Sequence, residues 1–106
     1  MSEWTDICHR DDIVPNTGRC ALFNGEQVAI FRVNEDFYAI NNHCPFSRAN
    51  VLSRGIVGSL SEHKVVASPL YKQHFDLETG QCLEDQSVTI KTYAVRLAGD
   101  TVQLAA

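Results

Sequence analysis

Two-residue turn signals divide this sequence into short apolar segments, and they constrain the fold more than any other feature. Asn24-Gly25 and Gly99-Asp100 each separate two runs of predominantly apolar residues. Asparagine, aspartate and glycine tolerate the positive φ angles that a two-residue hairpin turn requires, so each pair predicts an antiparallel hairpin. A further turn at residues 34–36 predicts that the chain reverses again after the first hairpin.

The segments between these turns have the length and composition of β-strands. No window of ten residues has a convincing helical period, and NVLSR (50–54) is expected to form a single helical turn at most. Short strands joined by hairpins predict an all-β fold, an antiparallel sandwich or small barrel without a substantial helix. The expected strands are two within 20–33, then 37–41, 64–68, 74–77, 87–91, 92–98 and 101–105.

The C-terminal segments show which side chains should share a face. Alternating residues of a strand point to the same side of the sheet. We therefore expect Tyr93, Val95 and Leu97 to lie together, and Val102 to lie with Leu104. In segment 87–91, Val88 and Ile90 should face one way.

Length, composition and charge exclude several classes of protein. The 106 residues suffice for one domain, spanning 1–106, and not for two hydrophobic cores. Apolar residues make up 44% and charged residues 21%, which is ordinary for a globular domain. The formal net charge is -4, and the basic residues are scattered singly. Nucleic acid is therefore not an expected partner, because phosphate binding requires a concentrated basic surface.

Cysteine spacing and the absence of long apolar segments indicate a reducing compartment. No apolar segment has the length of a secretory signal or a membrane-spanning helix, so we expect a cytoplasmic chain without membrane contact. The four cysteines form no C-x-x-C pair, which argues against a zinc ribbon or a thioredoxin-like motif. Cys8, Cys20 and Cys82 are expected to be small buried side chains.

Two loops carry the unusual residue combinations, in the stretches 42–63 and 68–73 that lack a clear strand. In a β scaffold, function usually lies in such loops. The first contains CPF (44–46), and the second contains SPLYK (68–72) followed by HFDLETG (74–80). This frame resembles the Rieske iron–sulfur fold. There, two loops offer a C-x-H and a C-x-x-H box, and two cysteines and two histidines hold a [2Fe–2S] cluster.

At the four Rieske ligand positions, this chain retains one ligand type. Cys44 matches the first cysteine, whereas Phe46, Ser68 and Tyr71 stand where the remaining ligands would be. Phenylalanine has no lone pair, and the hydroxyls of serine and tyrosine do not readily deprotonate near neutral pH. The resemblance therefore implies a Rieske-like domain without a cluster. No cofactor, metal or catalytic residue is expected on this chain.

The sequence is similar, over nearly its whole length, to a family without cluster ligands: the small subunits of the cytoplasmic NADH-dependent nitrite reductases of bacteria. The similarity rests on Trp4 with Ile7-Cys8 and on the segments 20–32, 51–55, 66–70 and 75–85. It implies a large partner subunit that carries FAD, an iron–sulfur cluster and sirohaem and reduces nitrite to ammonium in nitrate assimilation. The small subunit would support this oxidoreductase without activity of its own. Self-association is left open.

Phe46 and Tyr71 have a structural interpretation and a functional one. Their rings are expected to fill the space left by the cluster and to pack against each other or Leu70. The functional interpretation is a contact surface for the large subunit. Aromatic and arginine side chains are enriched at the energetic centres of interfaces. The expected partner-contact residues are Phe46, Arg48, Tyr71 and Lys72.

Two other functions stay open at this point. The chain resembles Rieske ferredoxins closely enough to be a free-standing electron carrier with a cluster on atypical ligands. A weaker alternative is a β adaptor for another oxidoreductase. A mononuclear metal on His43-Cys44 with His63 or His74 matches no zinc spacing, so scattered surface histidines are favoured.

Catalytic chemistry on this chain has little support in the sequence. A catalytic Cys44 is not favoured, because no general base other than its neighbour His43 is evident. The acidic pairs Asp11-Asp12 and Glu84-Asp85 are interpreted as solvated turns. No nucleotide-binding or serine-hydrolase motif is present.

Overall fold

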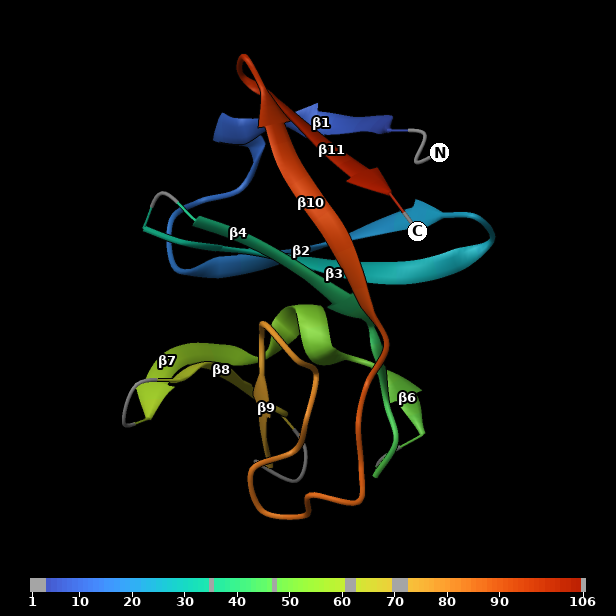
Figure 1. The fold of residues 1–106 in the computed structure, drawn as a ribbon, viewed down its shortest axis with the longest axis vertical. Helices are drawn as coiled ribbons and strands as arrows, with labels where there is room; N and C mark the ends of the chain where they lie inside the picture. Colours follow the sequence, from blue (N-terminus) through green and yellow to red (C-terminus); the bar gives the residue numbers. More distant parts are fainter. Residues whose placement is uncertain (1–3, 35, 47, 61–62, 70–72, 106) are drawn as a thin grey trace.

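The computed structural model describes residues 4–34, 36–46, 48–60, 63–69 and 73–105, and it shows an all-β fold (Figure 1). No helix in the described ranges is long and apolar enough to cross a membrane. Two short 3-10 turns, labelled η, accompany the strands. The elements are β1 (Thr5–His9), η1 (Arg10–Asp12), β2 (Thr17–Phe23), β3 (Glu26–Val33), β4 (Asp36–Asn41), β5 (His43–Cys44), β6 (Ala49–Asn50), η2 (Leu52–Arg54), β7 (Ile56–Leu60), β8 (His63–Ala67), β9 (His74–Asp76), β10 (Thr92–Ala98) and β11 (Thr101–Ala105).

A six-stranded antiparallel sheet is the larger part of the molecule, with the order β1-β11-β10-β4-β3-β2. The predicted hairpins are present, since β2 pairs with β3 from Phe23–Glu26 onward and β10 with β11 from Ala98–Thr101. Asn24 has a φ of 52°, as its turn requires. The predicted fold class is confirmed.

A smaller unit is built from residues 42–91, between β4 and β10 in the chain. It contains the three-stranded sheet β7-β8-β9 and the short ladder β5-β6. In Figure 1 it lies below the six-stranded sheet, on the side opposite to both termini. Both loops identified in the sequence belong to this unit.

Two clusters of buried side chains form the core. One fills the curved six-stranded sheet and includes Tyr93, Val102 and Leu104, with Val95 and Leu97 packed against it. This confirms the predicted faces of the last hairpin. The other cluster joins the sheet to the smaller unit and contains Phe31, Cys44, Leu52, Val66, Phe75, Leu77, Cys82 and Ile90 among others.

The structure corrects several predictions of local structure. Segment 87–91 is not a strand, although Ile90 is buried and Val88 packs on the core, and only Thr89 forms an isolated bridge with Gln81. Conversely, β1, β5, β6 and β7 were not predicted, and the last three lie in the stretch 42–63, which was expected to lack a clear strand. β1 and β7 are edge strands whose described side chains are exposed or half-buried, so they lack the apolar alternation that reveals a strand. The single turn expected within 50–54 is present as η2.

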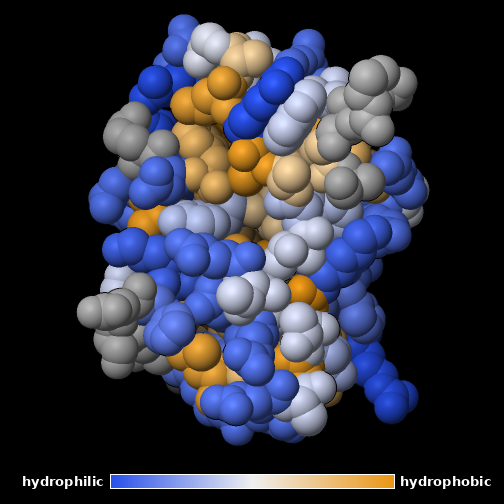
Figure 2. Space-filling view, viewed as in Figure 1, coloured by the Kyte–Doolittle hydropathy of each residue, from blue (hydrophilic) through white to orange (hydrophobic). Residues whose placement is uncertain are grey.

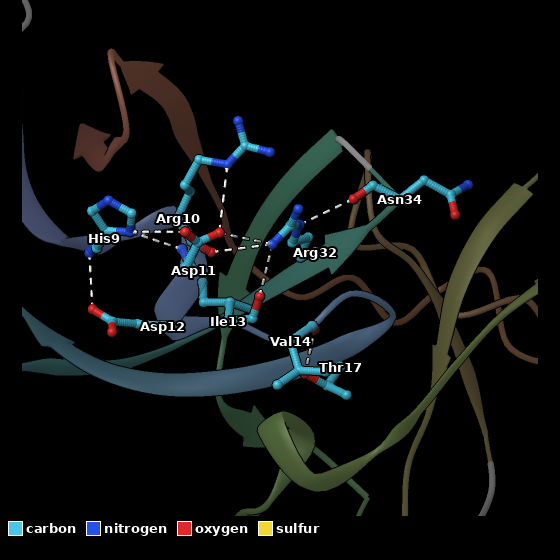
Figure 3. Close-up of polar contacts among 9 residues, drawn as sticks. All are labelled: His9, Arg10, Asp11, Asp12, Ile13, Val14, Thr17, Arg32 and Asn34. Atoms are coloured by element: carbon cyan, nitrogen blue, oxygen red, sulfur yellow. Dashed lines mark hydrogen bonds and ion pairs between the residues drawn. The ribbon is translucent and has the colours of Figure 1, made fainter.

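A buried arginine attaches the N-terminal segment to the sheet (Figure 3). The Arg32 side chain is 8% exposed, and its Nη1 donates to the carbonyl oxygens of Ile13 at 3.2 Å and Arg10 at 3.4 Å. Its Nε donates to the carbonyl oxygen of Asn34 at 3.1 Å. The Asp11-Asp12 pair is exposed as predicted, but Asp12 accepts the backbone N–H of His9 and so caps η1.

Candidate functional site

The first loop is organised by Asn42, which the sequence interpretation did not identify. This side chain is 1% exposed and bonds to four groups, one of which is Cys20 Sγ at 3.5 Å from its Nδ2. Its Oδ1 accepts the backbone N–H of Ser53 at 2.7 Å, and its Nδ2 donates to the carbonyl of Asn50 and to Gln27 Oε1, both at 3.1 Å. A buried amide that satisfies backbone groups on two sides fixes the path of the loop between them.

Cys44 and Ser68 bring the two loops together. Both side chains are buried, with 0% and 1% of their surface exposed, and Sγ lies 3.5 Å from Oγ. The backbone N–H of Ser68 donates to the carbonyl of Gln73 at 2.9 Å, which joins the two described ends of the second loop. Two of the four degenerate ligand positions therefore lie in contact, although 24 residues separate them.

Phe46 packs against Phe75 of β9, with ring centroids 6.1 Å apart and a tilt of 42°. It is half-buried against the core cluster that joins the sheet to the smaller unit. The sequence interpretation named Tyr71 and Leu70 as its neighbours. Both residues, together with Lys72, lie outside the described residues. Phe75 was not expected as a partner, because its place depends on how β9 packs.

These residues do not fit the [2Fe–2S] cluster that the Rieske frame implies. The Phe46 ring offers no donor atom, and Ser68 offers a neutral hydroxyl in a buried site. Cys44 alone retains a ligand type. The described residues contain no group of three or more histidine, cysteine or acidic side chains arranged to hold a metal ion.

Arg48 lies at the tip of the first loop in a left-handed conformation, with a φ of 57°. Its backbone N–H donates to the carbonyl of Cys44 at 2.7 Å, so the loop tip is anchored directly on the buried cysteine. The side chain is exposed. A non-glycine residue held at positive φ costs free energy, and such residues concentrate at functional sites.

The second loop is followed by a histidine–carboxylate contact that the sequence interpretation missed. Glu84 accepts the backbone N–H of His74 and contacts its ring Nδ1, both at 2.7 Å. Partial burial raises the pKa of Glu84, but the hydrogen bonds from the His74 backbone and ring outweigh this and hold the pKa below its ordinary value. Glu84 is exposed, as predicted for an acidic turn, yet it also fixes the start of β9.

A second histidine is also paired. His63 Nδ1 lies 2.6 Å from Oδ2 of Asp76, a carboxylate that is 8% exposed on its side chain. Oδ1 of Asp76 accepts the backbone N–H groups of Glu78 and Thr79 and so shapes the turn after β9. The prediction of scattered surface histidines misses these pairings, since the contacts arise only when β8, β9 and the following turn fold together.

Cys8, Cys20 and Cys82 are thiols in different surroundings. Cys82 is buried as predicted, and burial raises its pKa. Cys8 is half-buried, and burial raises its pKa as well. The prediction is wrong for Cys20, which is exposed on β2, an outer strand of the sheet.

Comparisons with known proteins identify the family. The protein-family model described as "Rieske-like [2Fe-2S] domain" matches residues 3–105 of this sequence. The "Nitrite reductase (NADH) small subunit" of Salmonella typhimurium is 49% identical over 106 residues, covering 98% of both chains. The solution structure of the Escherichia coli protein NirD has a TM-score of 0.92 at 47% identity, covering 100% of this chain and 98% of that one.

A larger relative contains a similar segment. The "Nitrite reductase [NAD(P)H] large subunit" of Klebsiella oxytoca is 35% identical over 99 residues, which are 93% of this chain and 10% of that protein. The match of the family model and the end-to-end similarity to the small subunits indicate the same family. This chain belongs to the Rieske-like domain family and, within it, to the small subunits of NADH-dependent nitrite reductase.

Proposed function

We propose that this chain acts by binding the large subunit of an NADH-dependent nitrite reductase, and that it supports nitrite reduction without a redox group of its own. The observation that carries the proposal is the segment of the Klebsiella oxytoca large subunit that is similar to 93% of this chain. A domain that is part of the large polypeptide in one organism is expected to associate with it where the two are separate chains.

The chemistry of the two loops supports a binding role. Cys44 and Ser68 are buried in contact with each other, so neither offers a reactive group to solvent. In this proposal the large subunit carries FAD, an iron–sulfur cluster and sirohaem and performs every electron transfer. The complex acts in the cytoplasm, where NADH is available.

The proposed docking surface is the tip of the two loops. Arg48 is exposed there, and its backbone is fixed by the bond to Cys44. Phe46 contributes a half-buried ring beside it. Tyr71 and Lys72 belong to the same proposed surface from their positions in the sequence. Arginine and aromatic side chains supply much of the binding energy in protein interfaces.

Co-expression with the large subunit tests this proposal. The large subunit is purified with and without this chain, and nitrite-dependent NADH oxidation is measured in both preparations. We expect the two chains to co-purify and the activity to rise when the small subunit is present. Unchanged activity together with a failure to co-purify would contradict the proposal.

A charge reversal at the loop tip tests the surface. Arg48→Glu should weaken co-purification by about tenfold or more. Arg54→Glu is the matched control, because Arg54 is also exposed but lies in η2, outside the loop between β5 and β6. Equal binding by both variants would exclude the loop tip as the docking surface.

A further inference from the structure

The six-stranded sheet contains an open seam between β4 and β10. The two strands pair only at Thr92–Ile40 and Tyr93–Ala39. In Figure 1, β10 then runs upward and away from β4. Beyond the last pair, a cavity of about 390 Å³ lies between the strands. We define the seam by the residues that line this cavity: Asp36, Phe37, Tyr38, Val95, Arg96 and Leu97.

The seam exposes hydrogen-bonding groups of the backbone. Ala98 and Thr101 close a two-residue turn, so alternate residues of β10, including Arg96, bond to β11. The N–H and C=O groups of Val95 and Leu97 therefore point to the other side, where the ladder to β4 has already ended at Tyr93. Such free strand edges are templates for pairing with another chain.

The side chains of the seam suit an extended peptide. Phe37, Val95 and Leu97 are partly buried and pack on the core of the six-stranded sheet. Figure 2 shows apolar side chains gathered on the upper half of this face, where Figure 1 places β10. An added strand would gain main-chain hydrogen bonds from the edge and apolar contacts from alternate side chains.

Arg96 supplies a positioned positive charge beside the seam. Its guanidinium lies 4.2 Å from the centre of the Trp4 ring, and its Nε donates to Gln103 Oε1 at 2.8 Å. Among the described residues, no carboxylate forms an ion pair with it. A planar guanidinium held in this way favours the binding of a peptide that carries a carboxylate beside Arg96.

Both ends of the described chain lie at this sheet. Trp4 stacks on Arg96, and Ala105 pairs with Ala94 of β10. β1 and β11, the first and last strands, are paired neighbours in this sheet (Figure 1). In the Klebsiella oxytoca relative, the similar segment is continuous with the large subunit, so that polypeptide joins the domain at one or both of these ends. A large subunit attached in this way would lie within reach of the seam.

We propose that the seam binds an extended segment of the nitrite reductase large subunit that bears an acidic side chain beside Arg96 and pairs with the free edge of β10. This inference rests on the proposed function and adds a second contact surface, at the end of the domain remote from Cys44 and Ser68. The segment adds a strand between β10 and β4, where the sheet is open.

Hydrogen–deuterium exchange on the complex tests the seam directly. The unaltered small subunit is measured alone and bound to the large subunit, in peptides that cover 36–39 and 94–98. We expect the seam amides to exchange about tenfold more slowly, or slower still, in the complex, because they become hydrogen-bonded. Arg96→Glu should weaken binding by about tenfold, whereas Arg54→Glu in the smaller unit should not.

The outcomes separate this inference from the proposed function. A complex whose seam amides exchange as fast as in the free chain would overturn the inference and leave the proposed function standing. Seam protection that depends on the concentration of the small subunit alone would assign the seam to a second copy and overturn the inference too. Failure to form any complex would overturn both.

Discussion

Cys44 Sγ lies 3.5 Å from Ser68 Oγ, and both atoms belong to buried side chains of different loops. Through this contact the two loops of the Rieske frame lie side by side, as two loops that supply ligands to one site would. A thiol and a neutral hydroxyl form only a weak hydrogen bond, however, and Phe46 turns its ring onto Phe75. The two loops therefore meet at Cys44 and Ser68, while Phe46 and Ser68 offer neither an imidazole nor a thiolate.

Restoring the ligand types should not restore a stable cluster. The triple variant Phe46→His, Ser68→Cys and Tyr71→His supplies two cysteines and two histidines. We expect at most weak iron binding, because a cluster also needs hydrogen bonds that orient its ligands, which these three substitutions do not supply. In addition, Lys72 stands in the sequence where the second Rieske box usually has a glycine. Iron content and visible absorbance measure the outcome. A stable brown protein with about two iron atoms per chain would show that ligand loss alone empties the site.

Iron content and visible absorbance of the unaltered chain also distinguish an accessory subunit from a ferredoxin-like electron carrier. We expect a colourless protein without stoichiometric iron after anaerobic purification. About two iron atoms per unaltered chain would instead favour an electron carrier with an atypical cluster.

Asn42→Ala should be strongly destabilising. It leaves the N–H of Ser53 and the carbonyl of Asn50 without their side-chain partner in a buried site. We expect the free energy of unfolding to fall by about 2–4 kcal/mol, as measured by urea denaturation. Asn50→Ala is the control, because the Asn50 side chain is exposed and contacts His43 alone among the described residues. A similar loss in both variants would contradict a special role for Asn42.

Arg32→Met should detach the N-terminal segment. The variant removes the donors to three backbone carbonyls at a nearly buried position, and we expect a loss of about 2–4 kcal/mol by urea denaturation. Arg32→Lys should rescue little, because an ammonium lacks the planar fork of a guanidinium. Arg19→Met is a suitable control, since Arg19 is exposed and donates one bond to the Asp12 carbonyl. Full stability of Arg32→Met would refute the role of Arg32 as an anchor.

Glu84 should contribute to stability at neutral pH and lose that contribution in acid. Its pKa is lower in the folded state than its model-peptide value of 4.5. The stabilisation is therefore fully present above about pH 4.5 and declines as the pH falls through the folded-state pKa. Glu84→Gln should flatten the dependence of unfolding free energy on pH in this acidic range.

Gln86→Ala is the control, because Gln86 is an exposed, uncharged side chain in the turn after Glu84. It should leave the dependence of unfolding free energy on pH unchanged. An identical slope for unaltered protein and Glu84→Gln would mean that the contact with His74 contributes nothing to folding.

Arg48→Gly separates the conformation of the first loop from its binding role. Glycine adopts positive φ without strain, so stability should stay within about 1 kcal/mol of the unaltered chain or rise slightly. Binding to the large subunit should weaken nevertheless, because the guanidinium is lost. Thermal unfolding and co-purification measure the two effects. Unchanged binding in this stable variant would indicate that Arg48 faces solvent in the complex.

The sequence by itself determined the hairpins and the fold class. Asn24-Gly25 and Gly99-Asp100 act through local backbone conformation, and the alternation from Tyr93 to Leu97 acts through the period of a strand. The four candidate ligand positions Cys44, Phe46, Ser68 and Tyr71 were assigned from their spacing within the two loops, and that assignment stays a prediction. Turn conformation, strand alternation and residue spacing all depend on neighbours in the sequence, so a short segment is enough to predict them.

Only the tertiary structure decided the contacts between distant segments. β1 is a strand because β11, at the other end of the chain, pairs with it, and 87–91 is not one because Ile90 enters the core from an irregular segment. The pairing of His74 with Glu84 and the seam between β4 and β10 depend in the same way on packing. Pairing and burial are decided by chain segments that meet only in the folded state, so no local pattern encodes them.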